Sequence, residues 1–213
     1  EPIKIEELLK KEIDNSKYKV VGCIFNNEYQ NLEYEIKRIR FEVENMIIYS
    51  KLEINRIKDF WELLNRLDTE TDYMMYEPNE RKAKTTVQEL KLDIQDNVIQ
   101  GFDFLQVATE NDKIVGYIRA ERGKFERNFH TAYIVIGILK KYRGKGIGTT
   151  FFNNLDLWTK TNNIVRLELT VECCNNTAKN LYEKNGFKIE GIRKKSMFVA
   201  GSFVDEFYMA KIL

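Results

Sequence analysis

Three glycines, Gly144, Gly146 and Gly148, stand close together in the segment KKYRGKGIGTTFF, residues 140–152. A glycine-rich turn between a strand and a helix lets backbone N–H groups converge on a ligand, and the N-terminus of the following helix favours a phosphate. The residues alone leave two interpretations open, a diphosphate cradle or a tight turn with a solvated basic face. The cations that surround the glycines are Lys140, Lys141, Arg143 and Lys145.

The spacing of these glycines excludes two common nucleotide-binding loops. The P-loop pattern GxxxxGK[ST] is absent, so its lysine and its magnesium-binding hydroxyl have no counterpart. The Rossmann pattern GxGxxG is missed as well, because the glycines form GxGxG and no ribose-binding acid follows at the usual distance. The segment does fit RxxGxG, with Arg143 in the first position.

A second candidate segment, NNTAKNLYEKNGF, occupies residues 175–187. Asn175 and Tyr182 are seven residues apart, about two helical turns, so a helix would place both side chains on one face. Ala178 lies between them and keeps that face shallow enough for a ligand to approach. Asn175 also stands where a helix N-cap is expected, which is its alternative role.

Together the two segments resemble the coenzyme A signatures of the GNAT superfamily of N-acetyltransferases. The first is similar to [QR]xxGxG[AG], from which Thr149 departs at the last position, and the second is similar to NxxAxxLYEKxGF. The resemblance covers residues 46–213 and leaves residues 1–45 unmatched. It implies acetyl-CoA as cofactor and direct transfer of its acetyl group to a primary amine of a small molecule or a protein N-terminus.

The resemblance also implies which groups hold the cofactor. In the family, the strand before the glycines carries a bulge and splays from its neighbour, and the pantetheine arm pairs with the opened edge. That role falls to the backbone around Gly137, where the Ile138 N–H would polarise the thioester carbonyl, a contribution of roughly 3 kcal/mol for such donors. The alternative is a core strand with a packing glycine. The predicted cofactor-binding residues are Ile136, Gly137, Ile138, Arg143, Gly144, Lys145, Gly146, Ile147, Gly148, Thr149, Asn175, Ala178 and Tyr182.

Tyr182 is the predicted general acid. A phenol, with an ordinary pKa of about 10, stays protonated at neutral pH and can give its proton to a thiolate whose conjugate acid has a pKa near 8.5. A covalent route through Cys173 or Cys174 is a weaker alternative.

The general base is left open by the sequence. The two-residue period of RLELTVE puts Glu168, Thr170 and Glu172 on one face of a strand. Some ribosomal-protein N-terminal acetyltransferases of the family carry a glutamate at the position of Thr170, and its absence here weakens any transfer of their mechanism. Glu168, Glu172 and His130 are the candidates, and each also has an ordinary structural interpretation as an ion-paired or packed side chain.

Composition limits the possible partners. Lys and Arg number 34 against 33 Asp and Glu, a formal net charge of +1, so no overall field attracts nucleic acid or an anionic membrane. No apolar run approaches the roughly 18 residues that span a bilayer, and a cytoplasmic protein, monomeric or homodimeric, is expected. Three cysteines, of which two are adjacent, and a single histidine predict reduced, mostly buried thiols and no metal site.

The hydrophobic periodicity predicts the elements that must position these residues. Their alternation indicates an α/β (α+β) domain with a mixed central sheet flanked by helices, to which the resemblance adds splayed central strands. We expect an N-terminal extension of unknown role over residues 1–45 and the acetyltransferase domain over residues 46–213. The predicted helices are 3–13, 57–67, 81–96, one following the glycines and 175–184; the predicted strands are 18–25, 32–43, 46–52, 102–108, 114–120, 133–139, 165–171, one beginning at residue 187 and 203–210.

The sequence therefore predicts an acetyl-CoA-dependent N-acetyltransferase. The alternative from another class is a non-catalytic acyl-CoA-binding sensor or partner module. A protein that binds NAD or ATP is a third possibility.

Overall fold

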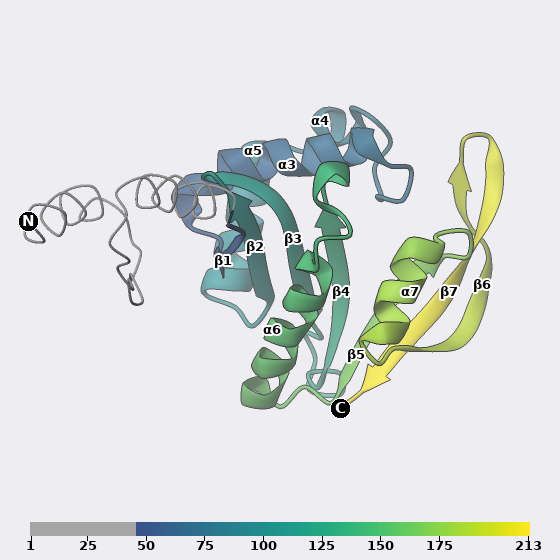
Figure 1. Ribbon diagram of the computed structural model, residues 1–213. Coiled ribbons are helices and arrows are strands. Elements are labelled where there is room, and N and C mark those ends of the chain that lie inside the picture. The colour runs from purple at the N-terminus through teal and green to yellow at the C-terminus, as the bar shows by residue number, and fades with distance from the viewer. Residues whose placement is uncertain (1–45) are drawn as a thin grey trace, which may run out of the picture. The chain divides into compact units, whose positions relative to one another are not determined.

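The computed structural model describes residues 46–213. The helix and strands predicted within residues 1–45, and Cys23, lie outside the described residues, and the division of the chain at residue 45 stays a prediction. In the described part a seven-stranded sheet has the order β1-β2-β3-β4-β5-β7-β6 (Figure 1). Its strands are β1 (Ile48–Lys51), β2 (Phe104–Glu110), β3 (Lys113–Arg122), β4 (Thr131–Ile138), β5 (Arg166–Glu172), β6 (Lys188–Val199) and β7 (Ser202–Ile212).

The sheet is mixed, as predicted. β4 pairs with β5 in parallel, and the other neighbouring strands are antiparallel. The continuously apolar strand β4 holds the middle position, which confirms its predicted central place. Both of its faces are covered by helices, so neither face needs polar side chains.

Helices flank the sheet and fall close to their predicted positions. The region predicted as one helix over 81–96 is two, because Thr86 caps a new helix: its hydroxyl accepts from the Glu89 N–H while the Glu89 carboxylate accepts from the Thr86 N–H. The helical segments are η1 (Ile54–Arg56), α3 (Ile57–Glu70), α4 (Glu80–Lys84), α5 (Val87–Asp93), the π-helix η2 (Ile94–Ile99), η3 (Lys140–Tyr142), α6 (Ile147–Asn162) and α7 (Asn176–Lys184).

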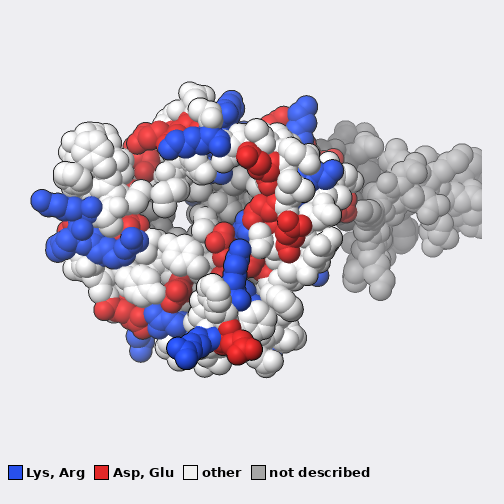
Figure 2. Space-filling model, turned by 180° about the vertical axis from the view of Figure 1, so that it is seen from behind, with Lys and Arg blue, Asp and Glu red and all other residues white. Residues whose placement is uncertain are grey.

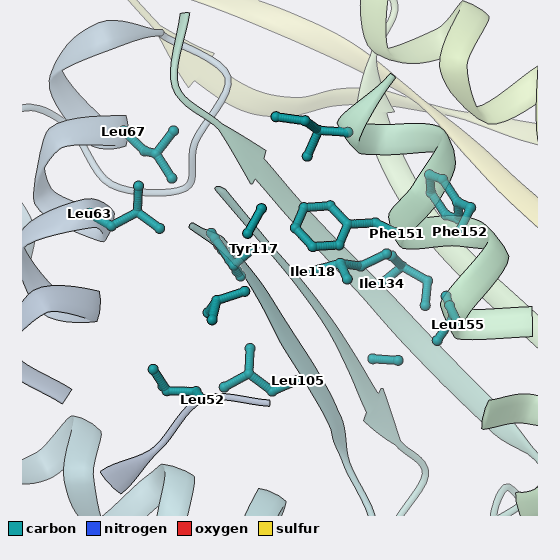
Figure 3. Packing of buried hydrophobic residues seen from close by; sticks show 14 of the residues in the cluster. Leu52, Leu63, Leu67, Leu105, Tyr117, Ile118, Ile134, Phe151, Phe152 and Leu155 are labelled. Carbon is teal, nitrogen blue, oxygen red and sulfur yellow. The ribbon is translucent and has the colours of Figure 1, made fainter. Parts of the chain in front are cut away.

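The hydrophobic core lies on both faces of the sheet. Leu63 and Leu67 reach it from α3, and Phe151 and Leu155 reach it from α6 (Figure 3). Across the α3 side the Phe60 ring meets the Tyr117 ring of β3 edge to face, with 5.2 Å between centroids. The two helices are thereby fixed to the strands that carry the candidate site.

The pairing of β4 with β5 stops early. Only three residue pairs form, the last being Tyr133 with Glu168, although both strands continue. The strands therefore separate toward their carboxyl ends, which confirms the expected splay. The expected bulge in β4 is not found, because its register with β3 runs without a shift from Gly116–Ile138 to Arg122–Ala132.

Packing explains Gly137 in β4. A Cβ there would lie 2.6 Å from Leu67 Cδ1 and 2.8 Å from Tyr117 Cε1. Distances this short do not occur between carbon atoms that are not bonded to each other, so Leu67 and Tyr117 would have to shift to admit a side chain. The glycine is needed for close helix–strand contact rather than for a bulge.

Cys173 and Cys174 lie in the turn between β5 and α7, and both are free. Cys174 is exposed, so the prediction of mostly buried thiols is wrong for this residue. The reason is that the chain leaves the sheet after Glu172. No helix within residues 46–213 is long and apolar enough to cross a membrane.

Candidate active site

The glycine segment forms a left-handed turn before α6. Gly144 and Gly146 have φ of +76° and +81°, which other residues rarely adopt, and no atom lies within 4 Å of where their Cβ atoms would be. The predicted turn is confirmed, and the space beside its backbone is open.

The N-terminus of α6 follows directly. Gly146 is its N-cap, and the Thr150 N–H donates to the Gly146 carbonyl at 3.1 Å. The preceding N–H groups, from Ile147 to Thr149, come too early in the helix to have a helical acceptor. Gly148 has a separate role, because a Cβ there would lie 2.7 Å from Leu181 Cδ2 of α7. Its absence of a side chain lets α6 and α7 approach each other.

The open edge of β4 presents its backbone to the gap between β4 and β5. The Leu139 N–H turns the other way and donates to the Val115 carbonyl of β3 at 3.0 Å. Because backbone groups alternate along a strand, the N–H and carbonyl groups of Ile136 and Ile138 face the gap. Arg143 Nε donates to the Ile138 carbonyl at 2.9 Å, which leaves the Ile138 N–H as the polar group at the end of this edge.

These features fit the diphosphate and pantetheine arm of coenzyme A. Open space lies beside two left-handed glycines, a helix N-terminus follows, and an unpaired strand edge leads away from it. Lys145 and Arg143 supply positive charge in the same segment. Among the described residues no cluster of side chains fits a metal ion.

Tyr182 lies inside the molecule beside this gap. Only 8% of its surface is exposed, and its ring packs against Phe152 and Phe187. Burial raises the pKa of the Tyr182 phenol above its usual range, and the nearby phenols of Tyr133 and Tyr117 add to the effect. The hydroxyl therefore keeps its proton at neutral pH.

Asn175 is the N-cap of α7, the alternative role expected from the sequence. Its Oδ1 accepts from the Ala178 N–H at 3.1 Å and caps α7, so only its amide Nδ2 is left for a ligand. Asn175, Ala178 and Tyr182 thus belong to one helix, as the sequence indicates.

Two of the predicted catalytic residues lie at the other end of the strands. His130 is exposed just before β4, and its carbonyl accepts from the Val165 N–H at 2.9 Å. Glu168 is in the last pair of the β4–β5 ladder, and its Oε2 accepts from Arg166 Nε at 2.7 Å. The structure brings neither residue to the open end of the gap.

The structure adds one pair that the sequence reasoning did not identify. The Tyr133 hydroxyl and Thr170 Oγ1 lie 2.8 Å apart, so a hydrogen bond joins β4 to β5 just beyond their last ladder pair. The only sequence signal was a tyrosine at the start of an apolar run, and nothing in it indicated the partner.

A cavity of about 210 Å³ lies at the carboxyl end of α3. It is formed by the loop between α3 and α4 and by the end of β6, and it combines methionine and phenylalanine side chains with carboxylates. Figure 2 shows the molecule from behind, where an opening lies near the middle of the described part and both acidic and basic side chains are present around it. The residues of the cavity that carry charge are Asp68, Asp72, Glu77 and Glu80.

Comparison with known proteins gives three informative relatives. The L-amino acid N-acetyltransferase AaaT of Escherichia coli (strain K12) is 30% identical over 110 residues, which are 50% of this chain and 66% of that protein, just under two thirds of its length. A GNAT-family acetyltransferase from Streptococcus pneumoniae has a similar structure, with a TM-score of 0.74 and 26% identity over 79% of this chain and 100% of that one. The structure of yncA, a putative acetyltransferase from Salmonella typhimurium with its cofactor acetyl-CoA, superimposes with a TM-score of 0.69 and 15% identity over 79% and 95% of the two chains.

A family model adds the decisive match. The model of the acetyltransferase (GNAT) family aligns with residues 60–187, which are more than half of the chain and include both the glycine turn and Tyr182. The chain therefore belongs to the GNAT acetyltransferase family.

Proposed function

We propose that this protein transfers the acetyl group of acetyl-CoA directly to a primary amine of a small molecule or a protein N-terminus. The observation that carries the proposal is the unpaired edge of β4, which leads from the glycine turn into a gap beside the buried phenol of Tyr182. The name of the Escherichia coli relative, which specifies L-amino acids, supports an amine acceptor of this kind.

When bound, acetyl-CoA supplies an acetyl group already activated as a thioester. Backbone N–H groups from Arg143 to Thr149 hold its diphosphate, and the amide Nδ2 of Asn175 is free to contact the pantetheine arm. The Ile138 N–H faces the gap and stabilises negative charge on the carbonyl oxygen. Tyr182 would hold a proton for the departing sulfur, and burial of that sulfur would raise the pKa of its thiol in the same direction as it raises the pKa of the phenol.

The state of the cysteines supports direct transfer. Partial loss of hydration raises the pKa of the Cys174 thiol, although the residue is exposed, and the Glu172 carboxylate adds to the effect. The pKa of the Cys173 thiol is raised as well, by burial and then by Asp205. Because the thiolate and not the thiol is the nucleophile, neither residue is prepared for a covalent route.

The test is release of free coenzyme A from acetyl-CoA with a panel of amines: an L-amino acid, a polyamine, a simple alkylamine and a peptide with a free N-terminus. Wild type is expected to turn over at least one of them. Tyr182→Phe is expected to lower kcat by about 10²- to 10⁴-fold, the usual contribution of a positioned proton donor. Its dissociation constant for coenzyme A should change little, because the ring stays in place.

Tyr49→Phe is the matched control. Tyr49 lies in the edge strand β1, and its ring packs edge to face on Phe151, so loss of its hydroxyl should leave kcat unchanged. Binding of coenzyme A with no turnover of any amine would contradict the proposal and favour a sensor or partner module.

A further inference from the structure

Glu172 is a buried carboxylate without a cationic partner. It ends β5, only 8% of its surface is exposed, and its one polar side-chain contact within residues 46–213 is the thiol of Cys174, 3.5 Å from Oε2. A buried charge is costly unless it is paired, and a thiol donates only weakly. When the Glu172 carboxylate is ionised, a group other than the Cys174 thiol must compensate its negative charge.

The neighbouring carboxylate shows the contrast. Glu206 is the partner of Glu172 across the β5–β7 ladder and is equally buried, with 6% exposed. Arg193 of β6 donates to Glu206 Oε2 at 3.1 Å and neutralises it. Of two adjacent buried carboxylates, one has its cation and the other does not.

Glu172 also lies on the face of the sheet opposite the predicted cofactor site. In the parallel ladder Tyr133 and Glu168 are paired, so the alternating side chains of Glu168, Thr170 and Glu172 share the face of Tyr133. That is the α3 face, because Gly137, four residues after Tyr133 on the same strand, faces Leu67 of α3. The helices α6 and α7, with the glycine turn, Asn175 and Tyr182, cover the opposite face (Figure 1).

One residue that lines the cavity, Asp72, interacts with the Glu172 carboxylate. Burial raises the pKa of Glu172 above the ordinary glutamate value; the Cys174 thiol acts in the opposite direction, and the carboxylates of Glu206 and Asp72 raise it further. Asp72 also lines the cavity, so this residue lies between the cavity and the carboxyl group of Glu172 in its effect. The titratable groups that act on Glu172 from the elements around it are Asp72 and Tyr73 after α3, Cys174 after β5 and Glu206 on β7.

We propose that the missing cation is the ammonium group of the acceptor, and that Glu172 is the catalytic residue that holds this group and takes its proton. The inference rests on the proposed function and assigns the base that the sequence leaves open. It selects Glu172 over Glu168, which is neutralised by Arg166, and over His130, which lies at the paired end of the strands.

The proton balance is complete with groups already described. The ammonium R–NH3+ gives one proton to the Glu172 carboxylate, and the lone pair released on nitrogen forms the new C–N bond to the acetyl carbon. The C–S bond breaks with its electron pair on sulfur, which takes the proton of Tyr182, and the surplus N–H proton of the new amide returns to the tyrosinate. Glu172 then loses its proton to water. Burial lowers the pKa of the ammonium and raises that of the carboxylate, so the first transfer is less unfavourable than in water.

The decisive experiment is the pH profile of kcat/KM for Glu172→Gln, with the best amine of the panel as substrate. In wild type, kcat/KM is expected to fall at low pH as Glu172 becomes protonated. The midpoint of this acid limb should lie above the ordinary glutamate pKa. Without the carboxylate only the neutral amine reacts, so the limb should move up to the pKa of the amine itself. The loss at pH 7 should be about 10²- to 10³-fold, with recovery toward wild type at high pH.

Two further measurements separate a chemical role from a structural one. The affinity of Glu172→Gln for the amine in the presence of coenzyme A, measured by calorimetry at pH 7, should fall at least tenfold, while its affinity for coenzyme A alone should stay within twofold. Its thermal midpoint at pH 7 should be no lower than that of wild type. The sign follows from linkage: a carboxyl with a raised folded-state pKa opposes folding at neutral pH, and this effect disappears once pH falls below its ordinary pKa.

Glu126→Gln, an exposed carboxylate in the loop before β4, is the control and should leave every measurement unchanged. The proposal is overturned if Glu172→Gln keeps the wild-type profile, if its loss is the same at every pH, or if Glu168→Gln or His130→Ala removes the acid limb instead. Failure of the proposed function would look different, because wild type itself would then turn over none of the amines.

Discussion

At the scale of single residues, two residues of the same type can serve different physical purposes. Gly146 is required by its positive φ and has open space beside it, whereas Gly137 has an ordinary strand conformation and no space at all. Glu172 and Glu206 also differ, because among residues 46–213 only Glu206 has a cationic partner. Residue type alone therefore does not assign a role.

The two glycines give a prediction that separates binding from stability. Gly146→Ala forces a left-handed conformation and is expected to cost about 1 kcal/mol in the free energy of unfolding while weakening coenzyme A binding at least tenfold. Gly137→Ala places a methyl group against Leu67 and Tyr117 and should cost about 1–3 kcal/mol, with little change in the affinity of the folded protein. Urea unfolding and calorimetry with coenzyme A check both variants. Equal effects of the two substitutions on binding would contradict this division.

At the scale of elements, a buried ion pair positions the loop that lines the cavity. Asp68, 2% exposed at the end of α3, accepts two hydrogen bonds from Arg81 of α4, at 2.6 Å from Nε and 3.0 Å from Nη2. The Arg81 guanidinium also lies over the Tyr76 ring, 4.3 Å from its centroid. The loop between the two helices is thus held at both ends.

Arg81→Met leaves the buried Asp68 carboxylate without its partner. We expect a loss of about 3–5 kcal/mol in the free energy of unfolding, and recovery of most of it in the double variant Asp68→Leu/Arg81→Met, because an apolar pair restores balance. Urea denaturation measures both. Lys84→Met, which removes a solvent-exposed ion pair with Glu80, serves as the control and should not shift the midpoint. A double variant as unstable as the single one would refute the account.

At the scale of the whole molecule, ligand-induced stabilisation tests the family assignment independently of turnover. Any ligand that binds only the folded state raises the thermal midpoint, by about 2.7 kcal/mol of stabilisation at one hundred times its dissociation constant. For a protein of this size that corresponds to about 5 to 10 °C. Coenzyme A and acetyl-CoA should produce this shift, and NAD and ATP at the same concentration should not. A larger shift with NAD or ATP would favour the nucleotide-binding alternative.

Much of this molecule is determined by its sequence locally. The turn at Gly144 and Gly146, the helix that begins at Ile147 and the capped helix at Asn175 all follow from backbone preferences that act within a few residues. The central place of β4 follows from its unbroken apolar run, because only a strand covered on both faces tolerates one. The glycine spacing and the segment around Tyr182 carried the family resemblance without any knowledge of the fold.

Tertiary structure alone decided which polar groups meet and which are compensated. Strand alternation placed Glu168 and Glu172 on one face, but Arg166 neutralises the first. The second lies beyond the paired part of β4 and β5, buried and without a cation among residues 46–213. Arg193, which neutralises Glu206, comes from a strand that follows later in the chain. The charge of a side chain follows from its residue type. Its desolvation and its partners depend on segments far apart along the chain, and these two factors determine its pKa and its reactivity.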